Sequence, residues 1–124
     1  MSKFIKIIYL VTITFLLLFL NLAKASEKLK IGILAPMTGP NKNLGQSIIK
    51  SIRLAVKDIN SNLIEVIPKD TSSSPEKTLQ AANELKEMGV RIVIGPIFYE
   101  NIIYLDEVDD LTFLSLTISF SRTH

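Results

Sequence analysis

The chain has 124 residues, with 14 Lys and Arg, 12 Asp and Glu, and no Cys. The absence of cysteine excludes a disulfide framework and lipid attachment at a cysteine. Three of the lysines lie within the first 24 residues, so the rest of the chain is close to neutral and has no clustered basic face, which excludes a nucleic-acid-binding protein.

The first 25 residues have the pattern of a secretory signal peptide. Lys3 and Lys6 precede an apolar run from Ile7 to Leu20, and Ala23-Lys24-Ala25 gives the small-x-small pattern of a signal-peptidase site. We expect cleavage before Ser26, with no membrane span left after it. The alternative is a retained membrane anchor, although the apolar run is shorter than the about 20 residues that a spanning helix usually needs.

The stretch that follows predicts a strand, a loop and a helix. Residues 29–35 are apolar and branched, and Pro36 with the Gly39-Pro40 pair predicts a loop after them. We expect a helix from about Leu44 to Asn60, with Asn43 as its N-cap. The apolar residues at helical spacing predict its buried face: Leu44, Ile48, Ile49, Ile52, Ala55, Val56 and Ile59.

A second strand and a second helix come next. Residues 63–67 predict a strand that Pro68 ends, followed by a polar loop over 69–74. Ser74-Pro75-Glu76 is typical of a helix start, with an N-cap, a proline in the first turn and an acid near it. We expect a helix over 75–88, with Gly89 as a left-handed cap. Its predicted buried residues are Thr78, Leu79, Ala82, Leu85 and Met88.

The remaining sequence predicts two more strands around a short helix. Residues 90–94 have the composition of a strand buried on both faces, and residues 111–120 are also strand-like. Between them, 98–108 predicts a short helix that frays at its acidic end. This alternation predicts an α/β fold with a parallel sheet of about four strands, flanking helices and right-handed crossovers.

The groups that most often carry catalysis are missing. There is no cysteine, the only histidine is the terminal His124, and no serine lies in a G-x-S-x-G elbow. The segment from Gly32 to Gly39 lacks both the G-x-G-x-x-G spacing and a Walker lysine. The acidic pairs within 106–110 fit a solvated turn better than an acid–base pair or a metal site. We therefore expect no enzyme, no catalytic residue, no cofactor and no metal.

Two motifs carry a family resemblance. IGILAPMTGPNKNLGQ, residues 31–46, resembles the opening of type I periplasmic solute-binding proteins of the Leu/Ile/Val-binding class, and is most similar to their penicillin-binding protein activator branch. VRIVIGP, residues 90–96, resembles the third strand of that family and the glycine after it. The resemblance runs from Lys30 to about Ser119. It implies a periplasmic protein in which residues 26–124 are an incomplete N-terminal lobe, a partial three-layer Rossmann-like domain.

The resemblance also implies where a ligand lies, because the family holds its ligand in the loops that follow the strands. By position, the residues facing the cleft would be Thr38, Phe98, Tyr99, Thr117 and Ser119. The alternative is that Thr38 only orders its own turn and that Phe98 and Tyr99 are core residues. Amino-acid binders of the family usually have serines or threonines where this chain has residues 97–100, and often an aromatic at Leu44, so the ligand stays open.

Three functions remain open at this stage. The first is the solute-binding protein of an ABC-type uptake system, which delivers an amino acid or a similar small polar solute to a membrane transporter. The second is a cell-envelope protein of the same fold that docks on and activates a peptidoglycan synthase, which the Phe98-Tyr99 pair favours. The third is a non-functional gene fragment. Because the chain ends four residues after its last predicted strand, we expect an interrupted domain, and a truncated or frameshifted reading frame would explain it.

Overall fold

The fold is built on a parallel sheet. The computed structural model describes residues 2–22 and 27–116, and within them four strands pair in the order β2-β1-β3-β4. All three pairings are parallel, which confirms the predicted α/β class. The strands are β1 (Leu29–Ala35), β2 (Ile64–Asp70), β3 (Ile92–Ile94) and β4 (Thr112–Leu114).

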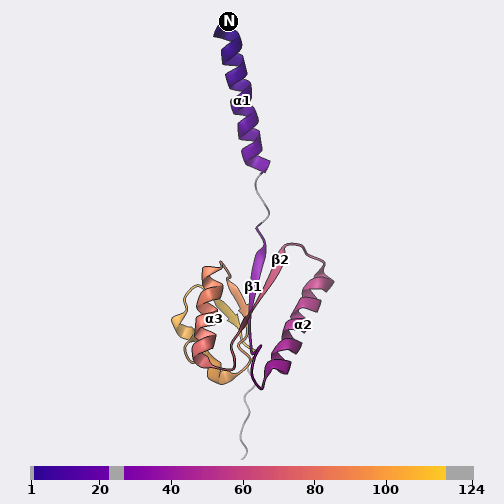
Figure 1. Cartoon of the computed structure of the whole chain (residues 1–124), viewed down its shortest axis with the longest axis vertical. Coiled ribbons are helices and arrows are strands. Elements are labelled where there is room, and N and C mark those ends of the chain that lie inside the picture. The colour runs from indigo at the N-terminus through magenta and orange to yellow at the C-terminus, as the bar shows by residue number, and fades with distance from the viewer. Residues whose placement is uncertain (1, 23–26, 117–124) are drawn as a thin grey trace, which may run out of the picture.

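Two helices cover opposite faces of this sheet (Figure 1). They are α2 (Lys42–Ile59) and α3 (Pro75–Glu87). Successive side chains of β1 alternate between the faces, so Ile33 and Ala35 join the cluster under α2, while Leu34 joins the cluster under α3. The sheet is therefore the middle of three layers, and β1 is buried on both sides.

The order of the strands reverses at β1. The chain moves from β1 outward to β2 through α2, then returns across β1 to β3 through α3. Right-handed crossovers in opposite directions place their helices on opposite faces, as observed here. Open α/β sheets bind ligands at such a reversal, beyond the carboxyl ends of the strands.

Helix α3 begins where the sequence predicts and ends one residue before the predicted end, at Glu87. The side chain of Ser74 accepts a hydrogen bond from the Lys77 N–H, Pro75 is the first residue of the helix, and Gly89 follows the end with φ of +80°. The predicted buried face is correct for Thr78, Ala82 and Leu85 and is completed by Ala81. Met88 is a correction, because it lies at the C-cap and is exposed.

The prediction that Pro68 ends the second strand is wrong. Strand β2 continues to Asp70, and Pro68 pairs with Ile33 inside the ladder. Proline is tolerated there because β2 is an edge strand, where one row of backbone groups needs no partner strand. Lys69 and Asp70 thus belong to the strand rather than to the loop.

The start of α2 also differs from the prediction. The helix begins at Lys42, its N-cap is Asn41 rather than Asn43, and the Asn41 side chain makes no capping bond. The buried stripe is narrower than predicted: Ile49 is buried, but Leu44, Ala55 and Ile59 are exposed. An 18-residue helix is about 27 Å long and a seven-residue strand about 23 Å, so the ends of α2 overhang β1 and β2.

The segment after β3 is not the predicted helix. Residues 98–108 form two 3₁₀ turns, η1 (Tyr99–Ile102) and η2 (Leu105–Glu107). The buried residues Leu105 and Val108 are three apart, the spacing that a 3₁₀ turn places on one side. Strand β3 is shorter than the predicted 90–94, and only its central Val93 is fully buried. Of the predicted last strand, β4 is present and residues 117–120 lie outside the described part of the chain.

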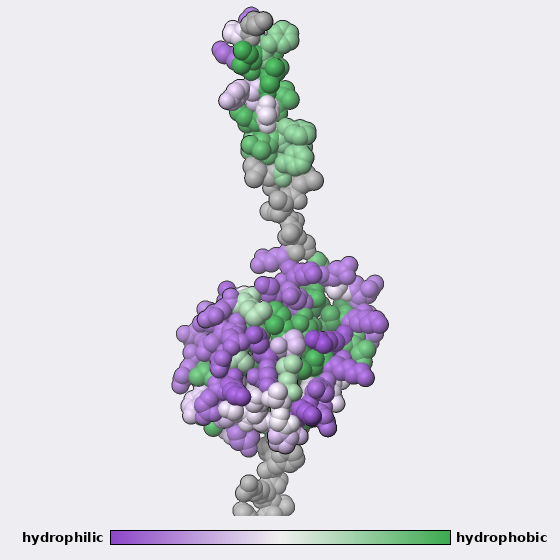
Figure 2. Space-filling model, in the orientation of Figure 1, coloured by the Kyte–Doolittle hydropathy of each residue, from purple (hydrophilic) through white to green (hydrophobic). Residues whose placement is uncertain are grey.

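The chain begins with a separate apolar helix, α1 (Ser2–Leu22). Its segment Ser2–Phe19 is long and apolar enough to cross a membrane, a test that signal sequences also pass. Figure 2 shows it as mostly hydrophobic side chains, in contrast to the largely hydrophilic face of the domain.

Candidate functional site

The candidate site lies at the carboxyl edge of the sheet. Because all four strands are parallel, the loops after β1, β2 and β3 leave the sheet at the same edge. These loops cover residues 36–41, 71–74 and 95–98. The loops after β1 and β3 follow neighbouring strands on the two sides of the reversal, so the structure brings the Thr38 loop and the Phe98-Tyr99 segment to one edge.

Thr38 is fixed by Asp70 at the end of β2. Its hydroxyl Oγ1 donates to Asp70 Oδ2 at 2.6 Å and lies 2.8 Å from Ser72 Oγ. The same carboxylate accepts the Met37 N–H at 2.7 Å and the Ser72 N–H at 2.8 Å, both at Oδ1. The register explains this contact, because Ala35 pairs with Asp70 and the two loops leave the sheet side by side. One carboxylate thus holds the loops after β1 and β2 together.

The pKa of Asp70 lies far below its ordinary range. Partial burial opposes the charged form, but it is outweighed by the hydrogen bonds from the Thr38 hydroxyl, the Met37 and Ser72 N–H groups and the Ser72 hydroxyl. A carboxylate that accepts several hydrogen bonds is held in its ionised form. Asp70 is therefore a charged structural anchor at neutral pH, and it is not a proton carrier.

This anchor predicts a pH-dependent stability. A group whose pKa is depressed on folding stabilises the protein above its unfolded-state value, here 3.8, and that contribution disappears as the pH falls through the folded-state value. We expect Asp70→Asn to unfold at a lower urea concentration than the unchanged chain at pH 7, and the difference to shrink as the pH falls below about 5. Asp109→Asn, which removes one exposed carboxylate, is the control. If the difference in unfolding midpoint between Asp70→Asn and the unchanged chain stays constant from pH 7 down to pH 3, the role of Asp70 is contradicted.

The two aromatic candidates have different environments. Phe98 is partly buried against the cluster of Ile33, Ala35, Ile49 and Ile97. Tyr99, the first residue of η1, is 65% exposed and its ring is open to solvent. Of the predicted site residues, Thr38 and Tyr99 are thus accessible at this edge, Phe98 supports it from the core, and Thr117 and Ser119 lie outside the described residues.

Three residues at or near the site are absent from the sequence-based prediction. Asp70 and Ser72 were not predicted as site residues because the second strand was expected to end at Pro68, which placed both in a solvated loop. The third is Asn101 in η1, which is 1% exposed and whose side-chain amide has no hydrogen-bond partner among the described residues. Buried amides are usually paired, and no sequence pattern marked this one.

The side chains around Asp70 also border a small hollow. It has a volume of about 330 Å³ on the side of α3, and its lining includes Lys69, Lys77 and Glu84. Lys69 Nζ donates to Glu84 at 2.7 Å, which lowers the pKa of that carboxyl. Across residues 2–22 and 27–116, no three side chains of His, Cys, Asp or Glu gather as metal ligands would.

Comparison with known proteins places this fold in a family. The profile described as periplasmic binding protein matches residues 28–101, more than half of the chain. The Leu/Ile/Val-binding protein BraC3 of Rhizobium johnstonii is 31% identical over 81 residues, which are 59% of this chain and 22% of that protein. The matched length is therefore less than a quarter of this relative.

Solved structures share the fold at low sequence identity. A leucine binding protein, LivK from Thermotoga maritima, aligns with a TM-score of 0.65 and 19% identity over 73% of this chain and 28% of that chain. LpoA from Haemophilus influenzae aligns with a TM-score of 0.61 and 23% identity over 76% of this chain and 17% of that chain. The chain belongs to the periplasmic binding protein family, which confirms the resemblance seen in its sequence and the expectation that it is not an enzyme.

Proposed function

We propose that residues 26–124 are part of the first lobe of an exported solute-binding protein that captures an amino acid or similar small polar solute for an ABC-type membrane transporter. The observation that carries this proposal is the paired position of the Thr38 loop and Tyr99 at the carboxyl edge, on either side of the strand reversal. Relatives named Leu/Ile/Val-binding proteins support a branched-chain amino acid as the first solute to test.

The hydrogen bonds of Thr38 suggest how it would meet such a solute. Its single hydroxyl proton is donated to Asp70 within the protein. The oxygen then offers only lone pairs, so Thr38 would accept a hydrogen bond from a solute ammonium group rather than donate to a carboxylate. Donors to the carboxylate would come from the hydroxyls of Tyr99, Thr117 and Ser119. Capture would be completed by closure of a second lobe over this edge, with no bond made or broken.

Export is the second part of the proposal. Residues 1–25 would act as a signal peptide that is removed before Ser26 in the periplasm. The apolar helix α1 and the small-x-small pattern at Ala23-Lys24-Ala25 support this assignment. Mass spectrometry of the exported product tests it, because a first residue other than Ser26 would contradict cleavage at that point.

Solute binding is tested by nuclear magnetic resonance. On titration of ¹⁵N-labelled chain with leucine, isoleucine and valine, we expect saturable shifts of the amides of Thr38 and Tyr99. The amides of Asn60 and Gly89, at the opposite edge, should not move. Tyr99→Phe should weaken binding about three- to tenfold by removing one hydrogen bond, with Tyr104→Phe as the matched control. Shifts spread evenly over both edges, or none at all, would contradict the site.

The exposed aromatic at this edge supports a second candidate function. Tyr99 and Glu100 stand where amino-acid binders of the family usually have hydroxyl residues, and LpoA, whose C-domain is described as a regulator of PBP1A, has the same fold. The chain would then dock on a peptidoglycan synthase instead of holding a solute. Co-purification with such a synthase that Tyr99→Ala abolishes, together with no response to amino acids, would favour this function.

A further inference from the structure

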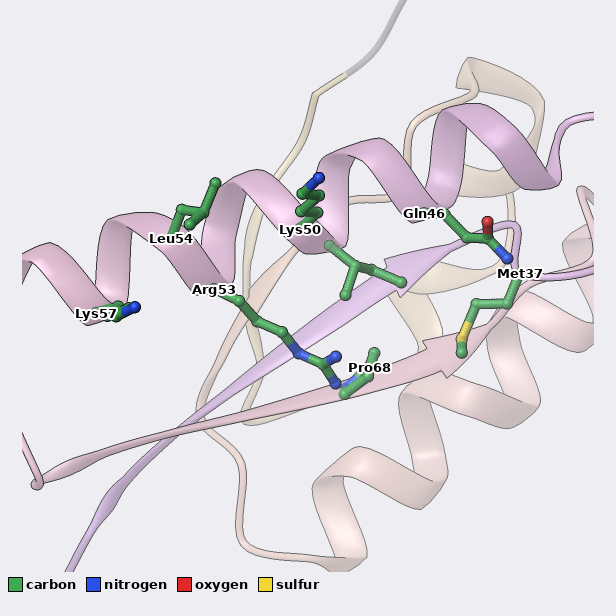
Figure 3. Close-up of a pocket in the computed structure, with 8 residues that line it drawn as sticks. Met37, Gln46, Lys50, Arg53, Leu54, Lys57 and Pro68 are labelled. Atoms are coloured by element: carbon green, nitrogen blue, oxygen red, sulfur yellow. The ribbon is translucent and has the colours of Figure 1, made fainter.

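A groove runs along α2 on the side of the edge strand β2 (Figure 3). Its volume is about 420 Å³, and its apolar lining comes from Met37, Ile49, Leu54 and Pro68. Ile49 is buried at the bottom of the groove, whereas Leu54 is half exposed. Neither Thr38 nor Tyr99 lines it, so the groove is a second surface beside the candidate site rather than part of that site.

The sheet side of the groove is fixed by backbone contacts. Met37 follows β1, and its N–H donates to Asp70 Oδ1 at 2.7 Å, in the same carboxylate that holds Thr38. Pro68 lies within the ladder of β1 and β2, opposite Ile33. The groove can therefore receive an occupant with little rearrangement, which lowers the entropy cost of binding.

The charged side chains along the groove are all cations. Lys50, Arg53 and Lys57 line it, and no carboxylate does. Among residues 2–22 and 27–116, no acid forms an ion pair with any of these three cations. Figure 3 shows the Arg53 side chain reaching from α2 toward Pro68. Like charges three and four residues apart on a helix repel each other, so an anionic occupant would relieve the repulsion without displacing a bound acid.

The spacing of these cations favours an elongated occupant. Along the axis of α2, Arg53 and Lys57 lie about 4.5 and about 10 Å from Lys50. A small carboxylate reaches only one of them, whereas carboxylates three and four residues apart on a second helix repeat at the same interval. The lining of α2 from Gln46 to Lys57 extends over about 16 Å, which is about three turns of such a helix.

The edge of β2 favours a helix over an added strand as the occupant. The Leu29 N–H donates to the Leu63 carbonyl at one end of the pair formed by β1 and β2. The Thr71 N–H donates to the Ala35 carbonyl at the other end, so the odd-numbered residues along β2 bond to β1. Pro68 is therefore among the residues that face the free edge, and it has no N–H to offer there. An extended peptide paired with β2 would lack that hydrogen bond.

We propose that this groove docks an acidic amphipathic helix of a partner protein, which lies beside α2 over the edge of the sheet. The apolar side of the partner helix covers Ile49 and Leu54, and its carboxylates pair with Lys50, Arg53 and Lys57. The long stems of these cations pack along the partner while their charged ends meet the acids. The proposal is independent of the solute, because the residues proposed to hold the solute do not line the groove.

The test uses a synthetic peptide of about 20 residues, long enough to form a helix, with glutamates three and four residues apart along one edge of an apolar face. We expect it to bind the ¹⁵N-labelled chain saturably, with shifts of the amides of Gln46, Lys50 and Arg53 and none in α3. The same peptide with glutamine in place of each glutamate should bind about tenfold more weakly. Added salt should weaken the glutamate peptide toward that level, because salt screens exposed charges.

A matched pair of double variants tests the charge. Arg53→Gln with Lys57→Gln should weaken binding of the glutamate peptide about fivefold, because two ion pairs are lost. Lys28→Gln with Lys42→Gln removes the same charge outside the groove and should leave the affinity unchanged. All four side chains are exposed, so circular dichroism should show an unchanged fold in both variants. Equal weakening by the two variants would overturn the proposal, because it would indicate attraction to the net charge alone.

Leu54→Ala tests the apolar contact and should weaken binding about threefold, because less apolar area is covered by the peptide. Leu63→Ala, at a similarly exposed leucine outside the groove, is its control and should have no effect. Equal affinities for the glutamate and glutamine peptides would overturn the proposal, and so would amide shifts centred on α3. Binding to vesicles that contain phosphatidylglycerol, with no binding of the peptide, would also overturn it and would assign the cations to a lipid surface.

Discussion

Gly45→Ala is expected to lower the free energy of unfolding by at least about 2 kcal/mol and to displace the loop that carries Thr38. A Cβ atom at Gly45 would lie 1.8 Å from the Pro36 carbonyl oxygen and 2.7 Å from its carbon. Both are backbone atoms, so no side-chain rotation relieves the clash, and α2 must move away from the loop after β1. The gain in helix propensity from glycine to alanine, about 1 kcal/mol, offsets only part of this cost.

Urea unfolding followed by circular dichroism measures the effect of Gly45→Ala. Ser47→Ala, two residues later on the exposed side of α2, is the control and should be neutral within about 0.5 kcal/mol. The amide resonance of Thr38 should shift in Gly45→Ala and not in Ser47→Ala. An unfolding midpoint equal to that of the unchanged chain would show that the contact between α2 and the Pro36 carbonyl is looser than described.

Leu85→Ala is expected to destabilise the domain by about 2–5 kcal/mol, which is enough to unfold a small domain of marginal stability. The Leu85 side chain is fully buried and belongs to the cluster between α3 and the sheet. Its δ carbons lie 2.7 and 3.2 Å from the position that a Cβ on Gly32 would take, so they fill the space above that glycine in β1. Truncation would leave a cavity there, because the backbone of β1 is held by strands on both sides.

The matched control is Leu54→Ala, the same substitution on α2 at a side chain that is half exposed. It should cost less than about 1 kcal/mol, because little apolar area leaves the core. Thermal unfolding of the two variants in parallel gives the comparison. Equal losses of stability in Leu85→Ala and Leu54→Ala would mean that a side chain in the cluster under α3 stabilises the domain no more than one on the surface of α2.

Local chemistry was enough to predict α3 and the alternation of strands with α2 and α3 along the chain. The boundaries of α3 are set by Ser74, Pro75 and Gly89, whose effects act within a single turn. The end of β2 was mispredicted because the tolerance for Pro68 depends on its being in an edge strand, and edge position is a property of the whole sheet. The exposure of Leu44 and Ile59 likewise follows from the relative lengths of helix and strands.

The candidate site was predictable in outline only. Thr38 and Tyr99 follow strands, and the carboxyl ends of parallel strands meet at one edge, so their general location could be derived. The bond from Thr38 to Asp70 spans 32 residues and exists only because Ala35 and Asp70 pair in register. Register is fixed by the packing of both faces of the sheet, which no local pattern specifies. The burial of Asn101 could not be predicted either, because it depends on how the 3₁₀ turn η1 packs against α3.

The central place of β1 has a consequence for the timing of folding. A chain exported from its amino end delivers β1 first, yet the two strands that pair with it begin only at Ile64 and Ile92. Until those segments have crossed, β1 has no ladder and both of its faces lack their helices. Strands that are far apart in the sequence pair slowly, because the entropy cost of closing the long loop between them comes before any favourable contact forms. In a chain exported as proposed, the central strand could therefore complete its pairing only after Ile92 has crossed.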